Sequence, residues 1–225
     1  MAETDWGKSG GLTTKRKRIM IYFIEATRSL IQTEGIDGLS IRKIATEAGY
    51  NSATIYNYFE DLEHLSLFGS VCYLRDYVLA LADSLHEGMN ARERFRTIYR
   101  CFNDIAFENP DVFYNMFFGR HREMLGDVLR IYYYELFPEE LSGISESMRR
   151  MMVAGSMFER DSVTMKEMVA EGFVDPAKAD ITLELIIAAH QSFIHDAWMQ
   201  GGTLDLDAHK EKFNQLFEYI LNAAR

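Results

Sequence analysis

The sequence predicts an all-α protein, and three observations support this fold class. Apolar residues recur at spacings of three and four along most of the chain, which is the period of a helix with one buried face. No stretch rich in Val, Ile and Thr alternates apolar and polar residues between turns, as a strand would. Proline, which interrupts helices, occurs only three times in 225 residues. A hydrophobic content of 48% is enough for a substantial core, in one elongated domain or two small ones.

Residues 1–13 are expected to form a disordered tail, because they contain three glycines and show no apolar periodicity. The first helix is expected from about Thr14 to Glu34, and Gly35 closes it. Its apolar stripe consists of Ile19, Phe23, Ala26 and Leu30.

Two short helices are expected within residues 40–59. Ser40 can cap the first of them, whose apolar stripe is Ile41, Ile44, Ala45 and Ala48. Gly49 ends this helix, because the residue just past a helix commonly adopts the left-handed conformation, which glycine enters without steric cost.

Asn51 or Ser52 begins the second short helix, in which Ile55 and Phe59 face inward. Its other side chains are mostly small and polar, and they are left to solvent or to a groove. Two short amphipathic helices joined by a glycine turn form the frame of a DNA-reading helix-turn-helix. Residues 14–60 are therefore predicted to be a three-helix DNA-binding domain.

The sequence of this segment resembles the N-terminal domain of the TetR family of bacterial transcriptional regulators. The resemblance spans roughly residues 15–65, and its motif is Gly35, Gly38, Leu39, Ser40, Ile44-Ala45, Ala48-Gly49-Tyr50 and Thr54-Ile55-Tyr56-Asn57-Tyr58-Phe59. Two departures are Asn51 and Ala53, where relatives usually have Ser and Gly; both residues suit a helix start. A third is Leu62, where many relatives have a lysine that contacts phosphate.

The net charge of −10 is unevenly distributed along the chain. Residues 1–60 hold 8 Lys/Arg and 7 Asp/Glu, whereas residues 61–225 hold 16 and 27. The basic run Lys15-Arg16-Lys17-Arg18 precedes the first apolar stripe, and Arg42-Lys43 opens the second helix. A basic run alone indicates only a solvated tail, but beside a helix-turn-helix it favours phosphate binding.

Twelve residues are predicted to contact double-stranded operator DNA. Backbone phosphates are assigned to Lys15, Arg16, Ser40, Lys43, Tyr56 and Tyr58, the two tyrosines by the family resemblance. Base edges are assigned to Asn51, Ser52, Ala53, Thr54 and Asn57, which occupy the exposed helix face. Arg42 is predicted to read a guanine, because the recognition helix itself carries no cation.

The rest of the chain is predicted to be helical, with a connecting helix over residues 61–86 and a larger domain over residues 87–225. The last two helices carry apolar side chains on more than one face, which predicts a homodimer through Ile187, Ile194, Trp198, Phe213, Leu216, Phe217 and Ile220. The alternative is that both stripes are covered within one chain. The family resemblance also implies a dimer.

The middle of this domain is rich in aromatic residues and Met, which suits a cavity for a small apolar or aromatic effector. The predicted lining is Tyr99, Phe102, Phe117, Phe118, Tyr133, Met152 and Phe158. Most aromatic residues at helical spacing are core residues, so each assignment competes with that simpler interpretation.

Other classes of function receive little support. No catalytic motif, cofactor loop or metal-ligand pattern is present, so we expect a non-enzyme without cofactor or metal. The longest stretch without Asp, Glu, Lys or Arg is 12 residues, so no membrane span is expected, and two isolated cysteines suit the cytoplasm. We predict a dimeric repressor of the TetR type that a small molecule releases from a palindromic operator. The rivals are a ligand-independent DNA-binding protein whose second domain only dimerises and, more distantly, a helical enzyme.

Overall fold

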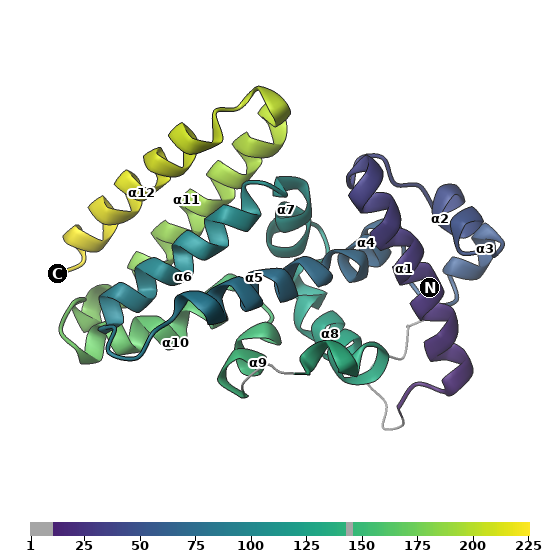
Figure 1. Ribbon diagram of the computed structural model, residues 1–225, viewed down its shortest axis with the longest axis horizontal. Coiled ribbons are helices and arrows are strands. Elements are labelled where there is room, and N and C mark those ends of the chain that lie inside the picture. The colour runs from purple at the N-terminus through teal and green to yellow at the C-terminus, as the bar shows by residue number, and fades with distance from the viewer. Residues whose placement is uncertain (1–10, 143–145) are drawn as a thin grey trace.

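The computed structural model describes residues 11–142 and 146–225, and these residues form helices joined by turns, without strands (Figure 1). The fold class is therefore all-α, as predicted. The first ten residues of the expected tail lie outside the described part. The α-helices are α1 (Thr14–Glu34), α2 (Ile41–Glu47), α3 (Ser52–Ile55), α4 (Leu62–Ser70), α5 (Cys72–Ser84), α6 (Ala91–Ala106), α7 (Pro110–Phe118), α8 (Leu125–Arg130), α9 (Glu146–Met152), α10 (Met157–Ala170), α11 (Ala179–Gln200) and α12 (Leu206–Ala223).

Shorter helical turns connect several of these helices. Residues 131–136 form a π-helical turn between α8 and Phe137, so residues 122–136 contain a 3-10 turn, an α-helix and a π turn in succession. The 3-10 turns are η1 (Arg122–Met124), η3 (Pro138–Leu141), η4 (Pro176–Lys178) and η5 (Gly201–Thr203), and the π turn is η2 (Ile131–Leu136).

The N-terminal domain comprises α1, α2 and α3, at one end of an elongated molecule (Figure 1). The first helix has the predicted bounds, and the Thr13 side chain caps it by accepting from the backbone N–H of Arg16. Phe23, Ile44, Ile55 and Phe59 are fully buried and form the core of this domain.

The connecting helix expected over residues 61–86 is interrupted at Val71, which separates α4 from α5. The Ser70 hydroxyl donates to the carbonyl of Ser66, and such bonds back to the helix favour bending. Gly69 lies so close to α1 that a Cβ there would stand 2.6 Å from Cγ2 of Thr27. Helix α4 therefore packs on α1 of the N-terminal domain, and α5 packs on α6 of the larger domain.

Residues 62–84 are long and apolar enough to cross a membrane by length and composition, and an 18-residue window within them has a mean hydropathy of 1.3. In the structure 67% of that window is buried inside the molecule, as in the core helix of a folded domain. Most apolar side chains of α4 and α5 are thus covered by the protein itself, whereas Leu79 is 38% exposed.

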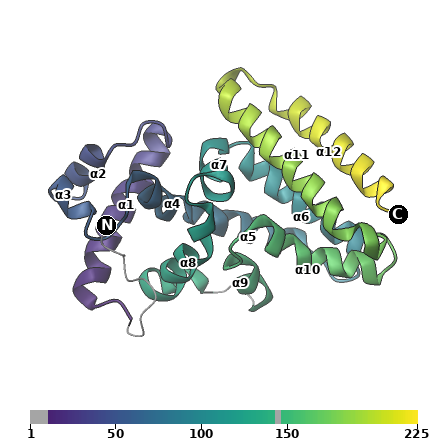
Figure 2. The ribbon, with the colours of Figure 1, turned by 180° about the vertical axis from the view of Figure 1, so that it is seen from behind.

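The larger domain is built around α5, α6, α10 and α11, which run alongside one another, while α12 covers the outside of α11 (Figures 1 and 2). Its core is dense in aromatic rings. Phe95 stacks on Phe217 with 5.8 Å between the ring centroids, and His190 stacks on Phe213 with 4.2 Å between the ring centroids. Because α12 is held by these rings, it belongs to the core of its own chain.

Candidate nucleic-acid interface and ligand cavity

The turn between α2 and α3 is built from the local signals that the sequence provides. The Ser40 hydroxyl caps α2 by accepting from the backbone N–H of Lys43 at 3.3 Å. Gly49 has a φ of +75°, which an L side chain rarely adopts. Asn51 caps α3, its Oδ1 accepting from the N–H of Ala53 at 2.9 Å. These interactions hold α3 at a fixed angle to α2.

The outer face of α3 presents the side chains predicted to read bases. Ile55 is fully buried, and it is the only α3 residue that is. Exposed or half-buried around it are Asn51, Ser52, Ala53, Thr54 and Asn57. Tyr56, at the end of α3, is 56% exposed, so its hydroxyl is free to reach a phosphate. The surface therefore offers hydroxyl, amide and methyl groups on one face.

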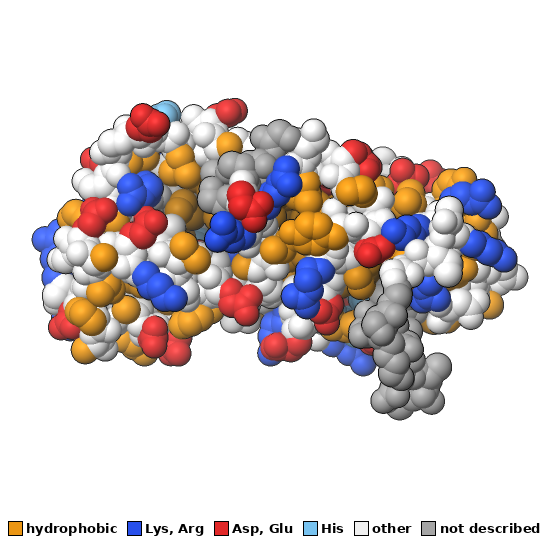
Figure 3. All heavy atoms as spheres, turned by 90° about the horizontal axis from the view of Figure 1, so that it is seen from below, with side chains coloured by type: hydrophobic (Ala, Val, Ile, Leu, Met, Phe, Trp, Pro, Cys, Tyr) orange, Lys and Arg blue, Asp and Glu red, His pale blue; other side chains and the backbone are white. Residues whose placement is uncertain are grey.

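Basic side chains flank this face at the start of α1. The guanidinium of Arg16 lies over the ring of Tyr58, 4.9 Å from its centroid, which positions two of the predicted phosphate contacts together. Lys15 and Arg18 are exposed, whereas Lys17 turns away to pair with Glu135 at 2.6 Å. Figure 3 shows Lys and Arg side chains over this end of the molecule.

The two basic residues at the start of α2 differ in their surroundings. Arg42 is exposed and available to DNA. The ammonium group of Lys43 contacts the carboxylate of Glu34 and donates to the carbonyl of Gly38 at 2.8 Å. Glu34 therefore competes with the phosphate that the sequence assigns to Lys43. Pattern analysis missed this pairing because the two residues lie on different helices.

Leu62, which replaces the usual lysine, is the first residue of α4 and packs half-buried against the core. Asp61 caps this helix by accepting from the N–H of His64 at 2.9 Å. The start of α4 is therefore well formed without the lysine.

The N-terminal domain touches the larger domain through several polar contacts between residues far apart in the sequence. Nε2 of His121 lies 3.0 Å from both carboxylate oxygens of Asp61. The backbone N–H of Ile36 donates to Asp111 at 2.8 Å, and the Trp198 indole donates to Asp37 at 3.1 Å. The N-terminal domain is therefore attached to α7, to the turn after α7 and to α11.

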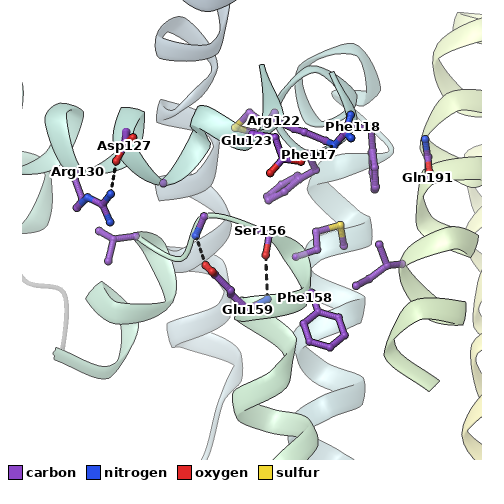
Figure 4. Close-up of a pocket in the computed structure, with 16 residues that line it drawn as sticks. Phe117, Phe118, Arg122, Glu123, Asp127, Arg130, Ser156, Phe158, Glu159 and Gln191 are labelled. Atoms are coloured by element: carbon purple, nitrogen blue, oxygen red, sulfur yellow. Dashed lines mark hydrogen bonds and ion pairs between the residues drawn. The ribbon is translucent and has the colours of Figure 1, made fainter. Parts of the chain in front are cut away.

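A cavity of about 720 Å³ opens between α7, α8, α10 and α11 (Figure 4). Phe117 and Phe118 line it from α7, and Phe158 lines it from α10. Charged and polar side chains contribute much of the remaining wall: Arg122, Glu123, Asp127, Arg130, Glu159 and Gln191. The cavity is thus more polar than a purely apolar effector requires.

Two backbone segments that line this cavity lie close together. Gly126 and Gly155 both line it, and a Cβ at Gly126 would stand 3.3 Å from Cα of Gly155. Next to this contact, Glu159 accepts from the N–H of Gly155 at 2.8 Å (Figure 4).

Of the seven predicted cavity residues, the three phenylalanines 117, 118 and 158 line the large cavity. Tyr99 and Phe102 line a much smaller adjoining hollow of about 20 Å³. Tyr133 and Met152 line neither of these two cavities: the Tyr133 hydroxyl donates to the carbonyl of Val71, and Met152 is fully buried. Burial of this kind depends on tertiary packing, which helical spacing does not encode.

The structure places the predicted dimer residues in several different surroundings. Ile194, Phe213 and Phe217 are buried in their own chain, with exposures of 0%, 1% and 4%, so they present little surface to a second chain. Ile187 lines the 720 Å³ cavity, and the ring of Trp198 packs against Tyr114. Leu216 is 37% exposed and Ile220 is half-buried. The large apolar side chains exposed on α11 and α12 are Ile181, Leu185, Met199, Leu216 and Tyr219.

Comparisons with known proteins find a matching family model for the N-terminal domain and solved structures with a similar fold. Residues 23–66 match the family model described as bacterial regulatory proteins of the tetR family. A structure of RolR in complex with its ligand resorcinol has 17% sequence identity and a TM-score of 0.62, over 93% of this chain and 89% of that chain. The fatty acid degradation regulator FadR from Bacillus halodurans has 15% identity and a TM-score of 0.54, over 92% of this chain and 96% of its own. No curated protein sequence matches the chain.

Proposed function

Because residues 23–66 match the model of the TetR family of bacterial regulatory proteins, we propose that this chain is a dimeric repressor of that family, released from its operator by a small molecule. The observation that carries the proposal is the exposed face of α3, which presents hydrogen-bonding side chains beside the basic start of α1. The family comprises regulators rather than enzymes, and the proposed place of action is on DNA in the cytoplasm.

On this proposal, α3 enters the major groove. Asn51, Thr54 and Asn57 contact base edges, with Ser52 and Ala53 beside them, and Arg42 reads a guanine from the end of α2. The phosphate contacts come from Tyr56 and Tyr58, the Ser40 hydroxyl and the cations Lys15, Arg16 and Lys43. The phosphate contacts set affinity and salt dependence, while the base contacts set the sequence preference.

A second copy of the chain is proposed to pair through the outer face of α11 and α12. One helix-turn-helix reads too few base pairs for useful specificity, so two are needed. The exposed Ile181, Leu185 and Met199 on α11, with Leu216 and Tyr219 on α12, supply apolar area for that contact. Two recognition helices about 34–36 Å apart would then require a palindromic operator.

The effector is proposed to bind in the larger domain. A volume of about 720 Å³ falls in the range of small-molecule sites, and three phenylalanine rings offer surfaces for an aromatic ligand. The wall of this cavity includes Arg122. The preceding residue, His121, contacts Asp61 at the start of α4 through its ring. A ligand that shifts this turn would therefore act on the N-terminal domain.

Release then follows from differential binding. The effector prefers an arrangement of the two DNA-binding domains that does not match successive grooves, and it lowers operator affinity by its free-energy preference for that arrangement. A coupling of about 1–3 kcal/mol changes affinity roughly 5–150-fold.

Selection of genomic fragments with the purified protein tests this function. The expected result is a palindromic site, bound at least about 1000-fold more tightly than scrambled DNA of the same composition, and lost on adding a compound that binds the larger domain. Selection of no sequence would contradict a repressor. Binding that no ligand of the larger domain alters would instead support a DNA-binding protein whose second domain only dimerises.

A further inference from the structure

Arg160 is a buried cation whose hydrogen bonds are incomplete. It lies in the first turn of α10 and is only 8% exposed. Its Nη2 donates to the carbonyl of Met152 at 2.8 Å, and its guanidinium lies over the Phe117 ring at 5.4 Å. Within the described part of the chain, Nε and Nη1 have no hydrogen-bond partner. A buried guanidinium with unused N–H groups is costly, and a ligand that accepts from them would remove that cost.

The neighbouring carboxylates are engaged elsewhere. Asp161 accepts from the Tyr99 hydroxyl at 2.5 Å, and burial raises the pKa of this carboxyl to about 7. Glu159 accepts from the N–H of Gly155, and Glu167 pairs with Arg94 at 3.0 Å. Among the described residues, Arg160 therefore has no carboxylate within ion-pair distance, although the whole chain carries a net charge of −10.

Arg160 lines a cavity of about 430 Å³ between α5, α6, α9 and α10. Leu81 of α5, Leu85 just after it, Ile98 of α6 and Met151 of α9 form its apolar wall. The other cations at this cavity are already paired, Arg94 with Glu167 and Glu171, and Arg150 with Glu146. Arg160 also lines the adjoining 20 Å³ hollow, which is large enough for about one water.

We propose that this cavity binds an amphipathic organic acid whose apolar body lies against Leu81, Leu85 and Met151 and whose carboxylate pairs with Arg160, once the guanidinium turns from its packed position to present Nε and Nη1 to the cavity. A single negative charge matches the single unpaired cation, which favours a carboxylate over a phosphate. This acid site is separate from the 720 Å³ cavity in which the effector is proposed to bind, and the proposal rests on the proposed function only in making the acid a second ligand that acts on operator binding.

The position of the cavity suits such a role. Leu81 belongs to α5, and Leu85 follows its last residue; α5 is joined through Val71 to α4, which packs on α1 of the N-terminal domain. Glu159, in the first turn of α10, lines both this cavity and the 720 Å³ cavity, so the two sites meet at the start of α10. An acid seated on Arg160 would contact the helix that leads to the DNA-binding unit.

Titration calorimetry with four probes tests the assignment: 2-naphthoate and decanoate as acids, and 2-naphthol and decan-1-ol as their neutral counterparts. The expected result is that at least one acid binds roughly 10-fold to 100-fold more tightly than its neutral counterpart. The ring-containing and straight-chain pairs distinguish an aromatic acid from a fatty acid.

Matched variants assign that preference to one residue. Arg160→Met should abolish the preference for the acid. Arg150→Met is the matched control, because Arg150 lines the same cavity. It should retain the preference, because the Arg150 side chain is 77% exposed and already paired with Glu146. Thermal melting followed by circular dichroism checks that both variants are folded. The wild-type comparison of acid with neutral probe stands by itself if Arg160→Met does not fold.

Three outcomes would overturn the proposal: equal affinity for acids and neutral counterparts, a preference that survives in Arg160→Met, or no binding of any probe at millimolar concentration. Each indicates that water or protein satisfies Arg160. Operator binding is measured separately with the selected DNA. Operator release by another compound, with equal affinity for acids and neutral counterparts, would leave the repressor function intact while refuting the acid site, and acid binding without any selected operator would do the reverse.

Discussion

The imidazole Nε2 of His121 lies 3.0 Å from both oxygens of Asp61, the residue that caps α4. His121 immediately precedes the η1 turn, which lines the 720 Å³ cavity, so one side chain joins the cavity wall to the base of the DNA-binding unit. This contact gives the proposed coupling a specific route.

His121→Ala should weaken effector release without abolishing DNA binding. Operator affinity of the effector-free variant should stay within about threefold of wild type, while the drop in affinity on adding effector should shrink from roughly 5–150-fold toward unity. Fluorescence anisotropy with labelled operator measures both. The control is His86→Ala, which removes an exposed histidine at the end of α5. Full release in His121→Ala would show that the signal bypasses Asp61.

Glu34→Gln should strengthen operator binding, because it frees the ammonium of Lys43 for a phosphate. The slope of log K against log salt concentration should steepen by about one per subunit. Glu47→Gln, an exposed acidic residue on α2, is the matched control for the change in net charge. Identical slopes in the two variants would mean that Lys43 does not reach the backbone.

Arg42→Ala should cost about 1–3 kcal/mol on the cognate operator and relax the preference at one base position per half-site. Tyr58→Phe should weaken all sequences alike, because its hydroxyl is assigned to a phosphate. Binding to cognate and scrambled DNA distinguishes the two. Equal losses on both DNAs for Arg42→Ala would refute its assignment to a base.

Leu185→Glu combined with Tyr219→Glu should yield a folded monomer that has lost specific DNA binding. Both side chains are exposed, at 51% and 73%, so the new charges should destabilise the proposed dimer contact and leave the fold of the single chain intact. Light scattering and circular dichroism report assembly and fold. Val163→Glu, at a side chain 62% exposed on α10, should remain dimeric. In contrast, Phe217→Ala should destabilise the chain itself by about 3–5 kcal/mol.

Asp161 should make stability fall as pH rises. Burial raises its pKa from 3.8 to about 7, so the native state keeps a proton that the unfolded chain releases. This contribution is complete below about pH 4 and is lost as pH approaches 7; the loss between pH 5 and pH 8 is about 3 kcal/mol. Asp161→Asn should remove that dependence, whereas the exposed Asp83→Asn should not. Urea unfolding at the two pH values measures the difference.

The DNA-binding unit could be predicted closely from the sequence because its signals are local. Ser40 and Asn51 act on N–H groups within three residues, and Gly49 acts through its own backbone angle. The bounds of α1 follow from a stripe, a cap and a closing glycine in the same way.

The lining of the cavities and the surroundings of the C-terminal apolar stripes could be predicted only in outline. The stripe of Phe213 and Phe217 has the same spacing whether it meets another chain or α6 of its own, and the structure has the second arrangement. Tyr99 and Asp161 meet across 62 positions, and no sequence period indicates that Arg160 is left unpaired beside them. Such features arise from packing between distant segments.

The contact of Gly126 with Gly155 has a consequence for how proteins of this architecture can diverge. Two stretches of main chain meet there without side chains between them, and a single added methyl group would have to push α8 away from the loop before α10. Neither glycine belongs to the DNA-reading unit. A one-residue change could therefore alter the room for a ligand while the operator sequence stays the same, which would allow duplicated copies of a gene to answer different chemical signals at one promoter.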